Sequence, residues 1–310
     1  MNRYFIVPVS IFFFIVIFFV LYFQFYDDEW KYFFKPEKKN TPEYCKDNSQ
    51  DLKKTIINLN IDKQLNRYFI DNKDNDKKLV HLIYLVPCDQ LSRNFDINNK
   101  IEKTIFNINE WFFKNSDKQK IKFDYKDDFL DITFIRVNKS LNWFNTFNSI
   151  QNKSDDNASR VEKIIYANKN IFNNFDDKKF IVFFEGWEKR KSFFHTTCGR
   201  ARYDGQVAVI YTNSDFKNKD TCSVIIEKDR DELGSEEQLI IHELLHLLGF
   251  PNKCSTNNVS EDQFHVNDSA DDILFKFSGG KYLDFNNDDY YNHSIADCQD
   301  LKDSKYLITY

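Results

Sequence analysis

Two histidines and a glutamate lie within one apolar segment of the chain, at His242, Glu243 and His246 in the sequence HELLH. A spacing of four residues places the two imidazoles on one face of an α-helix, one turn apart, where both can bind one metal ion. Glu243 is offset from them, which suits a base rather than a ligand. Zinc lowers the pKa of a bound water towards ~7, and the carboxylate takes its proton as it attacks a peptide carbonyl. The spacing predicts zinc on His242 and His246 and the general base at Glu243.

The segment around this motif, SEEQLIIHELLHLLG (235–249), has the features of a complete helix. Ser235 is the predicted N-cap, with Gln238 three residues later, and Gly249 ends the helix. A bare HExxH pattern also arises by chance, and two hydrogen-bonded histidines in a buried helix are the alternative. Ionisable side chains among Leu and Ile are costly to bury unless they are satisfied, which favours the metal.

A catalytic zinc usually has three protein ligands and one open position, so a third ligand is needed. The chain has six histidines, and His265 follows the helix in a polar loop that must fold back beneath it. His265 is therefore the predicted third ligand. Some zinc sites use a carboxylate as the third ligand, so Asp268, Asp288 and Asp289 are alternatives. His293 is a further alternative.

Two tyrosines, Tyr290 and Tyr291, lie in the polar sequence DDYYNH near the C-terminus. A tyrosine beside zinc can donate a hydrogen bond to the oxyanion of a tetrahedral intermediate, so both are candidates for that role, and packing is the alternative. The acidic residues Asp284, Asp288 and Asp289 could bind calcium, but they lack the glycine-centred spacing of an EF-hand loop.

The elements that must position these residues begin at Leu79. Short apolar runs predict strands, and apolar residues at helical spacing predict two helices before the HExxH helix, the second including Phe172. Such alternation implies an α/β or α+β domain with a mixed sheet. We expect an α+β fold with a partly parallel sheet, followed by a loop-rich C-terminal subdomain. The predicted strands are 79–87, 121–125, 130–137, 179–185 and 207–211, and the first helix is 98–114.

The sequence HELLHLLG resembles the zincin metallopeptidases, and its glycine resembles the metzincin branch, HExxHxxGxxH. The chain departs from that branch at Asn252, where the third histidine would stand, and its only methionine is Met1. A closer resemblance is to a group of secreted, largely uncharacterised bacterial zincin-like putative peptidases. The matching segments are HELLHLLGFPNKC (242–254), HVNDSADDILF (265–275) and LDFNNDDYYNH (283–293), with further likeness upstream from about residue 79.

This resemblance spans about residues 79–300, nearly all of the part expected outside the membrane, and it implies a zincin-like fold and hydrolysis of peptide bonds. It makes His265 the natural third zinc ligand and places Leu274 where the methionine turn would lie. It also implies that the strand VAVIY (207–211) lines the cleft and pairs with an extended substrate. A zinc-stabilised cell-surface binding domain without turnover and a cell-wall amide hydrolase are the alternative functions.

The N-terminus carries an uncharged apolar run from Tyr4 to Phe23. At about 1.5 Å per residue this run spans roughly 30 Å, the thickness of a bilayer core. A cleaved signal peptide would need small residues directly after the run, but Gln24, Phe25 and Tyr26 stand there. We expect a single-pass anchor over residues 1–26, with the rest of the chain extracytoplasmic, a linker or stalk at 27–78 with a helix within 49–70, and the metallopeptidase domain at 79–310.

Six cysteines are scattered through the chain, and none forms a CxxC pair. An even number of such cysteines behind a membrane segment is typical of disulfides in an oxidising compartment. Six cysteines allow 15 connectivities; pairing neighbours gives Cys45–Cys88, Cys198–Cys222 and Cys254–Cys298. Buried free thiols in a cytosolic domain are the alternative.

The composition argues against a disordered chain and against a nucleic-acid-binding protein. Hydrophobic residues make up 42% and charged residues 29% of the 310 residues, which is ordinary for a globular chain. The formal net charge of −5 argues against a nucleic-acid binder, which would be basic. The expected partners are a peptide or protein substrate and, through the N-terminal helix, a membrane.

Overall fold

The computed structural model describes residues 41–71, 78–146, 156–188, 198–213, 233–259, 262–276 and 280–310. The chain from Pro42 to Tyr310 forms one compact unit. Within the described residues, no helix is both long and apolar enough to cross a bilayer. The predicted anchor at Tyr4–Phe23 lies outside them.

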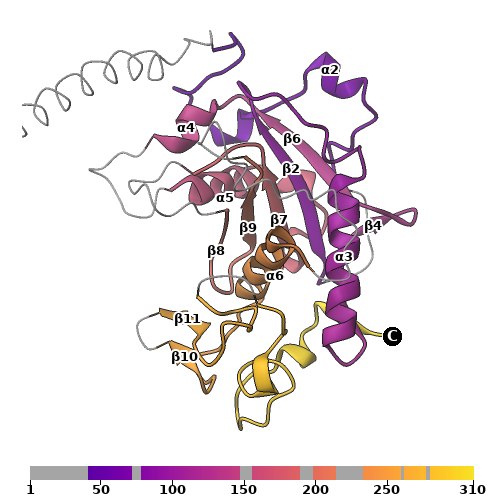
Figure 1. Ribbon diagram of the computed structural model, residues 1–310. Helices are drawn as coiled ribbons and strands as arrows, with labels where there is room; N and C mark the ends of the chain where they lie inside the picture. Colours follow the sequence, from indigo (N-terminus) through magenta and orange to yellow (C-terminus); the bar gives the residue numbers. More distant parts are fainter. Residues whose placement is uncertain are drawn as a thin grey trace, which may run out of the picture. The chain divides into compact units, whose positions relative to one another are not determined.

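A six-stranded mixed sheet forms the centre of this unit, with the strand order β1-β6-β2-β7-β9-β8 (Figure 1). The four inner strands run parallel, and β1 and β8 pair antiparallel at the two edges. The prediction of a partly parallel sheet within an α+β fold is confirmed. The bounds are β1 Ile56–Ile57, β2 Val80–Pro87, β6 Ile132–Val137, β7 Lys179–Phe184, β8 Gly199–Ala201 and β9 Val207–Tyr211.

Both faces of the sheet are covered by other elements. This explains why consecutive residues of its inner strands are apolar, rather than alternate residues only. In β2, Leu82 and Tyr84 join the core on one face, and Ile83 and Leu85 join the core on the other. Helices α3 (Lys100–Asn115) and α6 (Ser235–Leu247) contribute to the first core; α4 (Leu141–Asn145) and α5 (Asn157–Ala167) contribute to the second.

The first predicted helix, 98–114, is confirmed as α3 within two residues of each end. The second is shorter than its apolar pattern suggests, because α5 ends at Ala167 and Phe172 follows a separate 3-10 turn. Phe172 still packs in the same core as Val161 and Ile164. Apolar spacing therefore identified the buried residues here without fixing where the helix stops.

The helix predicted at 49–70 does not extend over that segment, and only the four residues Asn60–Lys63 are α-helical. The segment instead contains a 3-10 turn at Leu52–Lys54, strand β1 and the short helix α2 (Asn60–Lys63). Strand β1 pairs with β6, and the buried Asp62 accepts hydrogen bonds from the Arg136 guanidinium at 2.6 and 3.1 Å. Pairing with distant residues overrides local helical preference here.

The strand predicted at 121–125 is also displaced. Strand β3 (Gln119–Ile121) pairs with β12 (Leu307–Thr309) at the C-terminus in a separate two-stranded sheet. The following residues turn into a hairpin of β4 (Tyr125–Lys126) and β5 (Phe129–Leu130). The remaining strands, β10 (Asn258–Val259) and β11 (Asp262–Val266), form a hairpin after α6.

Two of the predicted disulfides are confirmed, Cys45–Cys88 and Cys254–Cys298. Cys222 lies outside the described residues, so the Cys198–Cys222 pair stays a prediction. The first bond joins Cys45, in the segment assigned from sequence to a linker, to the end of β2. The second joins the chain just after α6 to residues near the C-terminus.

A buried ionic network lies at the N-terminal ends of β2 and β7. The Lys178 ammonium donates to both carboxylate oxygens of Asp71, at 3.0 and 2.9 Å, and to Asp124. His81 bridges Asp124, at 2.8 Å from Nδ1, and Thr133, at 2.9 Å from Nε2. Burial alone would lower the pKa of Lys178, but the hydrogen bonds and charges of Asp124 and Asp71 outweigh it and raise that pKa. The ammonium is therefore held charged between two carboxylates.

The Lys178→Met variant is expected to lose about 3–5 kcal/mol of unfolding free energy, because it leaves Asp71 and Asp124 buried without their cation. Lys78→Met is the matched control. Lys78 pairs with Asp177 at 2.8 Å with both side chains about one third exposed, and such a pair contributes about 0–1 kcal/mol. Denaturant unfolding measures both; equal losses would mean that the buried network adds no more than a surface pair.

Candidate metal centre

Helix α6 carries the HELLH residues. It begins at Ser235, the residue that was predicted to be its N-cap. The N-cap is Gly234 rather than Ser235, and the Glu237 carboxylate accepts the Gly234 N–H at 2.8 Å. Glu237, not Gln238, therefore occupies the third helical position, and its side chain supplies the capping hydrogen bond. A shift of one residue does not change which face of the helix carries the histidines.

The C-terminal end of α6 turns the chain back onto the histidines. Gly249 has a φ of +91°, and the N–H groups of Gly249 and Phe250 donate to the carbonyls of His246 (3.0 Å) and Leu245 (2.9 Å). A left-handed glycine that ends a helix in this way reverses the chain direction at little cost. The reversal brings the Phe250 carbonyl to 3.0 Å from Nδ1 of His246.

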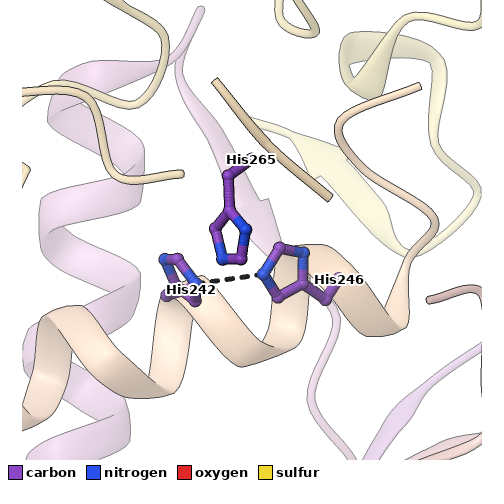
Figure 2. Close-up of side chains that lie close together, drawn as sticks. All are labelled: His242, His246 and His265. Carbon is purple, nitrogen blue, oxygen red and sulfur yellow. Dashed lines mark hydrogen bonds between the residues drawn. The ribbon is translucent and has the colours of Figure 1, made fainter. Parts of the chain in front are cut away.

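Three imidazoles converge beside this helix, as Figure 2 shows. His242 and His246 project from α6, and His265 projects towards them from β11. The ring centroids are 4.5 Å apart for His242–His246, 5.2 Å for His242–His265 and 5.0 Å for His246–His265. One nitrogen of each ring lies within 4.8 Å of the others, so the three rings can reach a single ion.

The hydrogen bonds of the two helical histidines define which ring nitrogen is available. Nδ1 of His242 lies 2.7 Å from the Ile273 carbonyl, and Nδ1 of His246 lies 3.0 Å from the Phe250 carbonyl. A carbonyl only accepts, so Nδ1 carries the proton in both rings and Nε2 keeps its lone pair. Burial and the nearby His242 lower the pKa of His246 well below its usual range, which keeps that ring neutral.

The carboxylate of Glu243 lies against strand β8. Burial raises the pKa of Glu243 to about 8, although the Ala201 N–H and the Arg200 guanidinium act in the opposite direction. Gly199 makes this close approach possible, because a Cβ at that position would lie 2.7 Å from Cγ of Glu243. A cation bound at the histidines would favour the ionised carboxylate.

An open cleft of approximately 760 Å³ lies over the three histidines and Glu243. Its other walls come from α5, from β8 and the residues after it, and from β11. Sequence patterns did not single out these residues, although the segment CGRARYDGQVAVIY contributed to the zincin resemblance. The walls include Ser159, Glu162, Gly199, Arg200, Ala201, Arg202, Tyr203 and Phe264.

The strand expected to line the cleft, VAVIY, does not do so along its length. This segment is β9, which pairs with β7 on one side and β8 on the other, and all five residues are buried. Strand β8 occupies the edge of the sheet and borders the cleft instead. A three-residue edge strand carries too short a pattern to be recognised from sequence.

The other sequence candidates lie elsewhere. The Tyr290 hydroxyl donates to Asp272 (2.8 Å), and the Tyr291 hydroxyl donates to Gln119 (2.9 Å). Both tyrosines are buried in the core and neither lines the cleft. This placement assigns them to packing rather than to an oxyanion. Asn252 bonds the Gln299 carbonyl at 2.8 Å and accepts from Tyr203 at 3.2 Å.

The alternative third ligands are not grouped with the histidines. Asp268, Asp288 and Asp289 cluster with one another, and His293 bonds the Gln299 carbonyl at 3.2 Å. Leu274, which the resemblance places at the methionine turn, is fully buried, and its neighbour Ile273 supports His242.

No protein-family model and no curated protein matches this chain. Among solved structures, it is similar to catalytically inactive OgpA from Akkermansia muciniphila in complex with an O-glycopeptide (glycodrosocin) substrate, with 11% identity and a TM-score of 0.37. That match covers 66% of this chain and 52% of OgpA. A chaperone–substrate complex matches with 13% identity and a TM-score of 0.29, over 64% of this chain and 31% of that one. This chain thus spans about half or less of either structure, and both TM-scores are too low to establish a common fold.

Proposed function

We propose that this chain is a zinc metallopeptidase, with His242, His246 and His265 as the ligands and Glu243 as the general base. The observation that carries the proposal is the convergence of three imidazoles beside a buried carboxylate at the floor of an open cleft. A buried helix with two satisfied histidines would need neither the third ring nor the cleft. A zinc ion would also give the neighbouring carboxylate a role as a base.

The geometry of the histidines fits a zinc ion. Nε2 of His242 and Nε2 of His246 are 3.0 Å apart, and both Nδ1 atoms already donate to carbonyls. Two nitrogen lone pairs that face each other repel unless a proton or a cation lies between them. Two nitrogens at about 2.0–2.1 Å from a tetrahedral zinc ion are about 3.3–3.4 Å apart, close to the observed separation. The two carbonyls supply the outer hydrogen bonds that orient histidine ligands.

Glu243 is placed to move the protons of peptide hydrolysis. Zinc, when bound, lowers the pKa of water and polarises the carbonyl that is attacked. Glu243 accepts the proton of the attacking water and passes it to the nitrogen of the leaving amine. The Ala201 N–H holds this carboxylate at the edge strand by a hydrogen bond. Gly199, which has no side chain, leaves room for it.

Among the described residues, β8 pairs with a strand on one side only, and its other edge is the proposed binding site for the peptide backbone. The Tyr211 N–H donates to the Cys198 carbonyl at 2.8 Å, so the backbone groups of the alternate residues Gly199 and Ala201 face away from β9. The Ala201 N–H already donates to Glu243, so a peptide would pair with the Gly199 backbone and the Ala201 carbonyl. An extended peptide can add to such an edge through main-chain hydrogen bonds. This would align a peptide carbonyl with the histidines through backbone contacts alone.

We also propose that the chain is anchored in a membrane with this domain on the extracytoplasmic side. The uncharged apolar run at Tyr4–Phe23 supports the anchor. The disulfides Cys45–Cys88 and Cys254–Cys298 support an oxidising compartment.

Metal removal tests the enzymatic proposal. The purified full chain is expected to contain one zinc per molecule and to cleave members of a mixed peptide library. Cleavage should stop when a chelator strips the metal and return on addition of zinc, because the imidazoles then regain their ion. Zinc content and the mass spectrum of the digest are the measurements. Bound zinc without any cleavage that the chelator abolishes would favour a binding domain over an enzyme.

A further inference from the structure

A second group of metal-binding side chains lies outside the histidine site. Asp268 follows β11, and Asp288 and Asp289 follow a 3-10 turn at Phe285–Asn287. Each offers one carboxylate oxygen, and these oxygens lie within 4.8 Å of one another. Segments about 20 residues apart in the chain thus bring three negative charges together.

No lysine or arginine among the described residues pairs with the carboxylates of this group, although the charge of His293 acts on Asp289. Both carboxylate oxygens of Asp268, Oδ1 of Asp288 and Oδ1 of Asn258 are shielded from solvent and lack a well-formed hydrogen bond. The Ser269 N–H and the Asp268 N–H lie near enough to lower the pKa of Asp268, but burial outweighs them and raises it. Among the described residues, no lysine or arginine nitrogen lies within 4 Å of Asp268, Asp288 or Asp289. A buried carboxylate without a partner is strongly unfavourable, so oxygens in this state point to a missing cation.

The surrounding backbone holds the group in position. The Asn257 N–H donates to Asp289 at 2.6 Å, and its side-chain amide donates to Asp289 at 3.1 Å and to Asp288 at 3.3 Å. Asp284, which is only 6% exposed, accepts the Asp289 N–H at 3.3 Å through Oδ2, while its Oδ1 has no hydrogen-bond partner. These hydrogen bonds hold the carboxylates close together despite the repulsion between their charges.

We propose that Asp268, Asp288 and Asp289 bind a calcium ion, a site separate from the zinc site and independent of the proposed activity. The donors are all oxygens, which hard cations prefer, and they come from loops, which suits the flexible geometry of calcium. Calcium–oxygen distances of about 2.3–2.6 Å allow one ion to bind oxygens up to about 4.8 Å apart. Magnesium demands shorter, octahedral contacts that this irregular group matches less well.

The position of this site gives the ion a structural role. Asp268 is three residues from His265, and Asn257 and Asn258 belong to the same β10–β11 hairpin or directly precede it. Calcium would fix this hairpin to the 288–289 segment, in addition to the nearby Cys254–Cys298 bond. A proton is the other way to relieve the charge, since burial and the charges of Asp289 and Asp288 raise the pKa of Asp268.

Calcium titration of the full chain, freed of calcium and supplied with zinc, tests the site. We expect one calcium per chain with a dissociation constant of about 0.1–1 mM, as in extracellular modules. We also expect the melting temperature to rise by about 3 °C or more at about 10 mM calcium, because only the folded chain has the site. Magnesium at the same concentration should raise it less. Equal rises with both ions, or no calcium bound at about 10 mM, would overturn the proposal.

The Asp268→Asn variant separates an ion site from a purely structural cluster. Without calcium it should melt no lower than the natural chain, because it removes one of three repelling charges, yet it should bind calcium at least about 10-fold more weakly. Asp128→Asn, in the exposed β4–β5 turn, makes the same charge change and should leave calcium binding unaltered. If Asp268→Asn does not fold, Asp288→Asn serves in its place. Unchanged calcium affinity in the folded variant would refute the assignment.

Discussion

The Glu243→Gln variant is expected to bind zinc as the natural chain does but to hydrolyse peptides about 100- to 10,000-fold more slowly, the range for loss of a general base. Glutamine keeps the shape of the side chain and can still accept the Ala201 N–H, but it cannot take a proton from water. Zinc content per chain and kcat/KM on a peptide cleaved by the natural chain are the two measurements.

Glu236→Gln is the matched control for this substitution. It lies in the first turn of the same helix and does not line the cleft. We expect its kcat/KM to stay within about 2-fold of the natural value, since it contacts neither substrate nor metal. Full activity in Glu243→Gln would falsify the mechanism while leaving the zinc site intact.

The His265→Ala variant is expected to lose both zinc and activity. Removing a ligand should weaken zinc binding by more than the about 10- to 100-fold that accompanies loss of a residue that only orients a ligand. His242 and His246 remain on the helix, but two ligands do not complete a catalytic zinc site. Competition with a chromogenic chelator measures the affinity, and the zinc-dependent rise in melting temperature should shrink accordingly.

His293→Ala is the corresponding control in the same C-terminal region. His293 bonds the Gln299 carbonyl at 3.2 Å and is not grouped with the metal-binding histidines. Its substitution should leave zinc affinity unchanged. If His293→Ala loses zinc and His265→Ala does not, the third ligand has been assigned to the wrong loop.

The sequence by itself determined the features that depend on local periodicity. Four-residue spacing put His242 and His246 on one helical face whatever the helix packs against. Continuous apolar runs identified strands that are buried on both faces, as β2 and β7 are. The disulfides are different, because the sequence left 15 connectivities open and the structure selected Cys45–Cys88 and Cys254–Cys298.

The tertiary structure decided what depends on residues far apart in the chain. Only the folded β10–β11 hairpin shows that His265, and not Asp268 or His293, faces the helical histidines. Only strand pairing shows that β8, rather than the more apolar β9, lies at the edge of the sheet beside Glu243. Tyr290 and Tyr291 stand in a polar stretch of sequence, yet tertiary packing buries them away from the cleft. Periodicity records which face of an element is buried, whereas the partner that buries it is chosen by contacts between segments that the local sequence does not encode.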